Sequence, residues 1–230
     1  MREREGLMRI AVVVLVVGLA PVAGAQITAS PNGYEGDYQG AASVQTVAVS
    51  ATAVSADPNS TVVEITFLDD IPSMDLLGDP DNVVFLFDIG GLTGWGNDAV
   101  MDGLGWDVTI HALDPSWRSE AVIYFDDAVN PDGVGVHLTP AVGDNSPGTG
   151  TYSSGGIIDL GDVPIPDVPL PDGWLRVELY ESWDDYADAM DAEYLTGSKL
   201  YVSVHPEPVT IMLLGLGIAG VASRRRQVRS

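Results

Sequence analysis

Short runs rich in Val, Ile, Thr, Phe and Tyr, separated by Gly, Pro, Asp and Asn, make up most of the sequence from residue 43 onward. Such runs are typical of β-strands joined by turns, and many of them in one chain favour two packed sheets. We therefore predict an all-β fold, a two-sheet sandwich with jelly-roll-like connectivity. The predicted strands are residues 44–55, 61–68, 83–89, 106–113, 121–125, 134–139, 149–153, 157–160, 175–181 and 200–204.

The apolar pattern of these runs also predicts which faces are buried. The runs at 108–113 (VTIHAL) and 174–182 (WLRVELYES) alternate apolar and polar residues, which predicts one buried face and one face in water. The run at 83–89 (VVFLFDI) is almost entirely apolar, which predicts a central strand covered on both sides.

Three segments have patterns that strands do not show. Apolar residues at helical spacing in SWDDYADAMDAEY (182–194) predict a short helix. The prolines of VPIPDVPLPDG (163–173) predict an extended connector or a covered edge. The glycines of GGLTGWGND (90–98) follow a strand without opening a helix, which predicts a flexible loop.

The N-terminus has the three parts of a secretory signal peptide, which we assign to residues 1–25. The apolar run at 10–20 is too short to cross a bilayer about 30 Å thick. The small residues Ala23 and Ala25 form the cleavage motif, so we expect Gln26 to be the mature N-terminus. The basic residues before the apolar run are Arg2, Arg4 and Arg9.

The segment 26–205, which we treat as one acidic sandwich domain, has 30 acidic and 3 basic residues and a net charge of −27. Such a charge repels nucleic acid, whose phosphates need basic partners, and it suits divalent cations. The chain has no cysteine, so disulfides and cysteine-ligated zinc are excluded. The core, or ions bound through oxygen, must therefore hold the fold together.

Acidic residues concentrate in two stretches, 69–82 and 95–107. Calcium takes six to eight oxygen ligands, and loops at one end of a sandwich can converge to supply them. The alternative is that these acids form an ordinary solvated surface. A third acidic set within 182–194 is either another cation site or the polar side of the predicted helix. The predicted calcium ligands are Asp69, Asp70, Asp79, Asp81, Asp98 and Asp102.

The sequence has no motif of a nucleophilic, zinc or nucleotide-binding enzyme. His111 and His137 lie in separate predicted strands, where we expect ordinary structural positions. Two carboxylates at the right separation would suffice for a glycosidase, but among 30 acids such a pair carries no information. The tryptophans at 95, 106, 117, 174 and 183 are either core and rim residues or platforms on which sugars stack.

The last segment, 206–230, combines a Pro-Glu-Pro triplet, an apolar stretch at 209–223 and three arginines. It resembles the PEP-CTERM sorting signal of exported bacterial proteins. This resemblance implies processing by an exosortase-type enzyme, use of the export machinery, and anchoring by a short transmembrane helix before delivery to the cell envelope or extracellular matrix. The residues that carry the resemblance are Pro206, Glu207, Pro208, Arg224, Arg225 and Arg226.

The body also resembles a group of exported β-sandwich proteins that carry this tail. The shared stretches include the GWD strand at 105–107, the YSSGG turn at 152–156 and the late acidic segment at 175–185. This resemblance implies the sandwich and no particular activity. We therefore expect a secreted, non-enzymatic protein of the cell surface or matrix, structural or adhesive, with calcium and exopolysaccharide as candidate ligands. The alternative is a secreted carbohydrate-active enzyme of the glycoside hydrolase type.

Overall fold

The computed structural model describes residues 26–29, 49–57, 60–128, 135–185 and 189–207. The predicted signal peptide with Ala23 and Ala25 lies outside these residues, and Gln26 is the first residue that is described. The apolar tail segment 209–223 and the three arginines after it also lie outside them. Within the described ranges, no helix has the length and apolar character needed to cross a membrane.

The chain folds into two antiparallel sheets, which confirms the predicted all-β sandwich; the jelly-roll connectivity stays a prediction. The smaller sheet has the strand order β1 (Gln26–Ala29), β8 (Val136–Thr139), β7 (Ala121–Asp127), β12 (Trp174–Glu181) and β5 (Val83–Asp88). The larger has the order β2 (Val49–Asp57), β3 (Ser60–Phe67), β14 (Lys199–Pro206), β6 (Ala99–Ala112), β13 (Ala192–Tyr194) and β4 (Ile71–Ser73), with β9 (Gly148–Ser153), β10 (Ile158–Asp159) and β11 (Val168–Leu170) also on β6.

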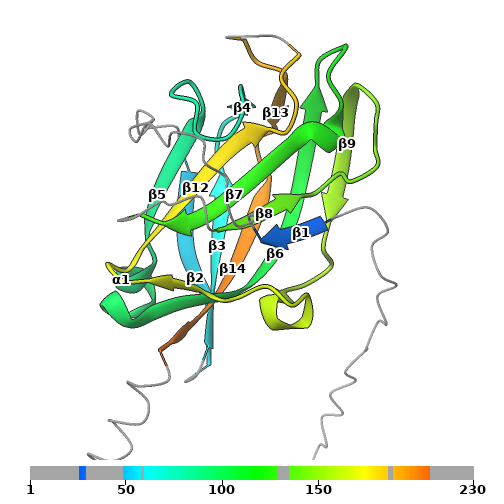
Figure 1. Ribbon diagram of the computed structural model, residues 1–230. Coiled ribbons are helices and arrows are strands. Elements are labelled where there is room, and N and C mark those ends of the chain that lie inside the picture. Colours follow the sequence, from blue (N-terminus) through cyan, green and yellow to red (C-terminus); the bar gives the residue numbers. More distant parts are fainter. Residues whose placement is uncertain (1–25, 30–48, 58–59, 129–134, 186–188, 208–230) are drawn as a thin grey trace, which may run out of the picture.

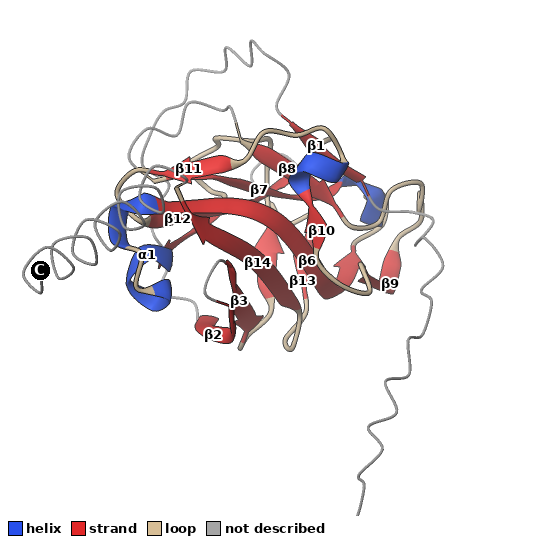
Figure 2. Ribbon diagram, turned by 90° about the horizontal axis from the view of Figure 1, so that it is seen from below, coloured by secondary structure: helices blue, strands red, loops and turns tan. Residues whose placement is uncertain are grey.

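One hydrophobic core lies between the two sheets. The strands of the smaller sheet pass in front of those of the larger one in Figure 1, and Figure 2 shows the two layers from below. Phe67 of the larger sheet and Phe85 of the smaller one place their ring centroids 6.3 Å apart, so they join the layers. Trp106 of β6 is only 1% exposed. Each side chain buried in this way contributes about 1.5 to 3 kcal/mol.

Strand β6 is 14 residues long, about 48 Å at 3.4 Å per residue, and strands of the larger sheet pair with it along both of its edges. One of its edges pairs with β14 and then β13, and the other pairs with β11, β10 and β9. Gly103 and Gly105 allow the segment before β10 to lie directly against it. A Cβ atom on Gly103 would be 2.8 Å from Ile157 Cγ2, and one on Gly105 would be 2.7 Å from the Gly156 carbonyl oxygen.

Two sequence predictions about local structure are wrong. The described part of 182–194 contains no helix, and its last three residues form β13, which pairs with β4 and β6. The segment 90–98 does open a short helix, α1 (Ile89–Thr93), followed by the 3₁₀ turn η1 (Gly96–Asp98). The Asp88 carboxylate caps α1 by accepting from the Gly91 amide at 2.7 Å. The proline-rich segment 163–173 contains β11, in agreement with a covered edge.

Two predictions about buried faces are also wrong. Strand β5, expected in the centre, is an edge strand of the smaller sheet, and its Leu86 is 39% exposed. The outer face of β12, expected in water, is buried at Arg176 and Glu178. These two side chains form an ion pair with 2.6 Å between Nη2 and Oε2. A buried charged side chain needs a partner of opposite charge. Arg176 and Glu178 are partners of one another, so both can be buried at positions where the alternating sequence pattern predicts exposure to water.

His137 of β8 packs between two tyrosines on the outer face of the smaller sheet. Its Nδ1 atom is 2.8 Å from the Tyr180 hydroxyl, and its ring centroid is 4.7 Å from that of Tyr124. Burial lowers the pKa of His137 to about 4, because the charged imidazolium loses its hydration there. In the unfolded chain the pKa returns to about 6.5.

We predict that His137 weakens the fold in acid. Below about pH 6.5 the unfolded chain takes up a proton that the folded chain refuses until about pH 4, so stability is lost as the pH falls through this window. Between about pH 7 and pH 4.5, the wild type should lose about 2 to 3 kcal/mol more unfolding free energy than His137→Gln. Urea unfolding at both pH values measures this, and parallel pH profiles for the two proteins would contradict it.

Candidate functional site

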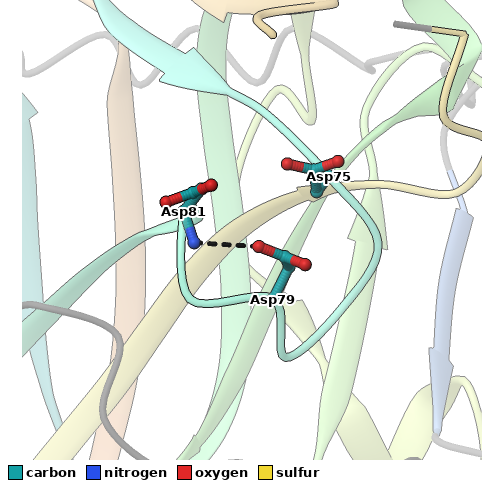
Figure 3. Close-up of side chains that lie close together, drawn as sticks. All are labelled: Asp75, Asp79 and Asp81. Carbon is teal, nitrogen blue, oxygen red and sulfur yellow. Dashed lines mark hydrogen bonds between the residues drawn. The ribbon is translucent and has the colours of Figure 1, made fainter. Parts of the chain in front are cut away.

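Three aspartates from the loop between β4 and β5 gather at one point. Asp75, Asp79 and Asp81 each place a carboxylate oxygen so that all three oxygens lie within 4.8 Å of one another. Figure 3 shows that the three side chains come from one loop. Asp75 is buried, Asp79 is partly buried and Asp81 is exposed, so the group extends from the interior to the surface.

Hydrogen bonds inside the loop hold these aspartates in place. The Asp81 amide donates to Asp79 Oδ1 at 2.9 Å, the bond drawn in Figure 3. The Asp79 amide donates to the Leu76 carbonyl at 3.1 Å, which closes the turn. The Asp75 amide donates to Asn82 Oδ1 at 2.9 Å, and this bond joins the two ends of the loop. Aspartate and asparagine favour such turns because their side chains bond to nearby backbone amides.

The loop is tied to β12 through Glu178, whose side chain is 0% exposed. Glu178 Oε1 accepts from the Gly78 amide at 2.7 Å and from Asn82 Nδ2 at 2.8 Å. The other oxygen of Glu178 faces Arg176, so this carboxylate is paired on both sides. The hydrogen bonds to Glu178 therefore fix the acidic loop to β12 of the smaller sheet.

This geometry fits a divalent cation bound through oxygen. Two oxygens that bind one calcium ion at 2.3 to 2.6 Å are at most about 5 Å apart, and the three aspartates meet this condition. Three carboxylates supply three to six ligands, and backbone carbonyls and water can supply the rest. The set contains no nitrogen or sulfur ligand, which favours calcium over transition metals.

The structure brings together only part of the predicted calcium set. Asp79 and Asp81 belong to the loop group, while Asp69 and Asp70 lie between β3 and β4. Asp70 Oδ1 accepts from the Thr196 amide at 2.7 Å and from its hydroxyl at 2.8 Å, and these bonds lower the pKa of Asp70. Its position is thus explained by a structural role.

Asp98 and Asp102 lie apart from the loop because β6 begins at Ala99, seven residues earlier than the sequence pattern predicts. Asp98 is therefore an exposed residue of η1, and Asp102 is part of β6. Asp75 was not among the predicted ligands, although it belongs to the same acidic stretch. The signal that could have found it is the grouping of Asp75, Asp79 and Asp81 in one short loop directly before a strand.

The predicted sorting motif begins inside the fold. Pro206 is the last residue of β14, is buried, and pairs with Ala99 of β6. The Glu207 amide then donates to the Asp98 carbonyl at 2.7 Å. Pro208 lies outside the described residues. The body and the sorting segment are therefore joined without an intervening linker.

Comparison with known proteins places a PEP-CTERM protein-sorting motif at residues 206–226. This motif is consistent with an exosortase substrate and implies an exported, surface-directed protein. No curated protein matches the chain in sequence.

Two solved structures share a weak likeness with the chain. One is the crystal structure of the infectious bursal disease virus VP2 subviral particle, with 10% identity, a TM-score of 0.25, and coverage of 85% of this chain and 37% of that chain. The other is the structure of the infectious bursal disease virus Gt strain, with 9% identity, a TM-score of 0.25, and coverage of 85% and 40%. The chain thus spans less than half of either protein, and likeness at this level supports no functional statement.

We predict that the loop binds calcium and that Asp79→Asn with Asp81→Asn removes this binding. For a dissociation constant of about 10⁻³ to 10⁻⁴ M, about 10 mM calcium should stabilise the wild type by about 1.4 to 2.7 kcal/mol through this loop. The calcium-induced rise in melting midpoint should then be about 3 to 10 °C smaller in the double variant.

The matched control is Asp69→Asn with Asp98→Asn, which removes the same charge from two exposed residues outside the loop. Melting curves with calcium and with chelator measure the effect. An equal response of the two double variants would show that general charge screening, and no loop site, causes the stabilisation.

Proposed function

We propose that this protein is an exported, non-enzymatic component of the cell surface or extracellular matrix, and that its sandwich binds polysaccharide. The observation that carries the proposal is the junction between body and sorting motif, where the motif at 206–226 starts at the last residue of β14. At about 3.3 to 3.6 Å per residue, Glu207 and Pro208 span at most about 7 Å. The folded body therefore stays close to whatever holds the tail.

We predict that the sorting triplet controls where the body accumulates. Glu207→Ala with Pro208→Ala, made in the full chain, should shift the protein from the surface or matrix fraction to the membrane fraction. Pro206 is left unchanged because it is a buried residue of β14. Immunoblots of fractionated cells measure the shift.

The control for this experiment is Asp162→Ala, which changes an exposed acidic residue far from the tail in sequence. It should leave the distribution as in the wild type. The proposal fails if the triplet variant and the control are distributed alike.

Exposed tryptophans support polysaccharide as the ligand. Trp183 is 65% exposed and Trp117 is 42% exposed, whereas Trp106 is buried in the core. The segments that carry Trp117 and Trp183 are joined by hydrogen bonds through Glu120. The Ser182 amide, one residue before Trp183, donates to the Glu120 carbonyl at 2.8 Å, and Glu120 Oε2 accepts from the Trp117 amide at 2.7 Å. The two exposed tryptophans are thus carried by hydrogen-bonded segments, and large exposed apolar side chains on one surface are a feature of binding sites. Because the body is strongly acidic, a neutral polysaccharide fits it better than an acidic one.

We predict that Trp183→Ala weakens binding to a neutral polysaccharide about tenfold, which corresponds to about 1.4 kcal/mol. The loss follows from removal of the aromatic face on which a sugar ring stacks. Trp174→Ala is the matched control, because Trp174 is another exposed tryptophan, with 39% of its surface accessible. Trp174 begins β12 and Glu181 ends it, so Trp174 lies about 23 Å from the end of the strand that precedes Trp183. Titration calorimetry or a gel-retardation assay measures affinity, and equal losses in both variants would contradict a site at Trp183.

The alternative function, a glycoside hydrolase that uses loop carboxylates, is tested by incubating the purified protein with a panel of polysaccharides. A glycosidase needs two carboxyl groups that reach the scissile bond. Glu181 has a strongly raised pKa, as a general acid requires, but it is 0% exposed and therefore out of reach of a sugar. Release of reducing ends that a single Asp79→Asn or Asp81→Asn substitution abolishes would establish the enzyme and overturn the structural proposal.

A further inference from the structure

The C-terminal end of β14 holds the first part of the sorting triplet, Pro206, Glu207 and Pro208, inside the larger sheet. Pro206 is buried and pairs with Ala99, the first residue of β6. The Glu207 amide donates to the Asp98 carbonyl at 2.7 Å, which extends the contact by one residue beyond β14. The first two residues of the segment that a sorting enzyme must recognise are therefore also part of the fold.

The residue before the triplet adds side-chain contacts to this pairing. His205 pairs with Val100 of β6, and its Nδ1 atom lies 2.8 Å from the Pro206 carbonyl oxygen. Its Nε2 atom is 3.6 Å from Oδ2 of Asp167, the residue directly before β11. Since β11 pairs with the other edge of β6, the end of β14 contacts two neighbouring segments.

A β-bulge separates this end from the rest of β14. From Lys199 to Ser203 the strand pairs with β6 in one register, and the register shifts between Ser203 and Val204. Only three pairs with β6 follow the shift, those of Val204, His205 and Pro206. Because a bulge interrupts the ladder locally, these last pairs can open without disturbing the pairs that precede them.

The other edge of β14 loses its partner before the strand ends. The pairing with β3 stops at the pair of Val204 with Thr61, so that His205 and Pro206 pair with β6 alone among the described strands. Proline has no N–H to donate, which suits a position that is paired on one side. The last two residues of β14 are therefore bound by fewer strand partners than its middle.

We propose that this pairing prevents the exosortase-type enzyme from binding the triplet, and that the end of β14 must separate from β6 before the triplet is processed. An enzyme that recognises an extended peptide uses the main-chain hydrogen bonds and the side chains of that peptide. In the folded protein, β6 pairs with this segment and Pro206 is buried. The inference rests on the proposed sorting of the protein through this motif.

Local opening of the strand end supplies the form that the enzyme can bind. Strand ends open with smaller free energies than the centre of a sheet. When such opening is fast, processing follows the population of the open form, and the apparent affinity of the enzyme falls with that population. The stability of the last pairs of β14 therefore controls how fast the protein is processed.

The first test frees the triplet without changing it. The six residues Gly-Ser-Gly-Ser-Gly-Ser are inserted between His205 and Pro206 of the full-length chain, which allows the triplet to move up to about 20 Å from β6. Pulse–chase labelling of the producing cells measures how fast the precursor is converted. Conversion should be about three to ten times faster than in the wild type, because the triplet no longer depends on opening of β14.

The matched control is the same insertion combined with Glu207→Ala and Pro208→Ala. This variant should not be converted, because the enzyme still has to recognise the triplet. Fast conversion of the control would show that another protease cuts the inserted residues, and it would count against the inference.

The second test locks the end of β14 onto β6. His205→Cys with Val100→Cys replaces a directly opposed pair, whose Cβ atoms lie about 4.5 to 5.5 Å apart, close to the separation that a disulfide needs. The chain has no other cysteine. In membranes isolated from the producing cells, the oxidised variant should be converted at least about tenfold more slowly than the wild type. Reductant should restore its conversion, and the wild type with and without reductant is the control.

The inference is overturned if the insertion leaves the rate of conversion unchanged, or if the oxidised cysteine pair is converted as fast as the reduced one. Failure of the proposed function gives a different result, because Glu207→Ala with Pro208→Ala in the otherwise unchanged chain would then be distributed as the wild type. If that variant accumulates in the membrane while the insertion and the disulfide change nothing, sorting through the motif stands and this inference alone fails.

Discussion

The fold depends on the hydrogen-bonded edges of one strand, β6. The short strands β10 and β11 contribute only two and three residues to the larger sheet, and strands of this length have no stability of their own. They are ordered because β6 extends alongside both of them and its backbone groups on this edge form hydrogen bonds with theirs. Close pairing along this edge requires glycines in β6, because a side chain at Gly103 or Gly105 would push the neighbouring segment away from the strand.

The few basic residues of the body leave its buried acids Glu181 and Asp191 without a salt bridge among the described residues. Each of the three basic side chains of the body is used in an ion pair on the outer surface of a sheet or beside a turn. None of these pairs involves Glu181 at the end of β12 or Asp191 directly before β13. Exposed charges of like sign repel weakly in water, but buried ones repel strongly because the medium screens them less. Burial therefore raises the pKa of Glu181 well above its usual value, which favours the neutral form of this carboxyl group.

Much of the fold could be predicted from the sequence, because regular alternation over five or more residues is a strong signal. The strands that the prediction missed are β1, β4, β11 and β13, each of three or four residues, which is too short for any periodicity to show. The segment before β13 was predicted as a helix because its aromatic and alanine spacing suits one. Pairing with β4 and β6 overrides that local preference, and such pairing cannot be seen in a local pattern.

The candidate sites were less predictable than the fold. Acidic loops were recognised, and Asp79 and Asp81 were among the predicted ligands, but their convergence with Asp75 depends on the turn that Asn82 closes. The sequence could not single out Glu181, because nothing in its sequence neighbourhood distinguishes it from the 29 other acids of residues 26–205. Its burial comes from the end of β12 lying against the β4–β5 loop, where the Glu181 amide donates to the Asp75 carbonyl at 2.8 Å, and this contact is a property of the assembled fold.

The junction at Pro206 also determines how the body would respond to mechanical load. β14 is bonded on one side to β3 and on the other to β6, and the tail leaves from its C-terminal end. A pull on the tail therefore acts along the strand and loads both rows of hydrogen bonds in shear, so that many bonds must break together. A tail attached to an edge strand at right angles would instead open the bonds one after another. A sandwich held at a surface by this strand is built to resist being drawn away from it.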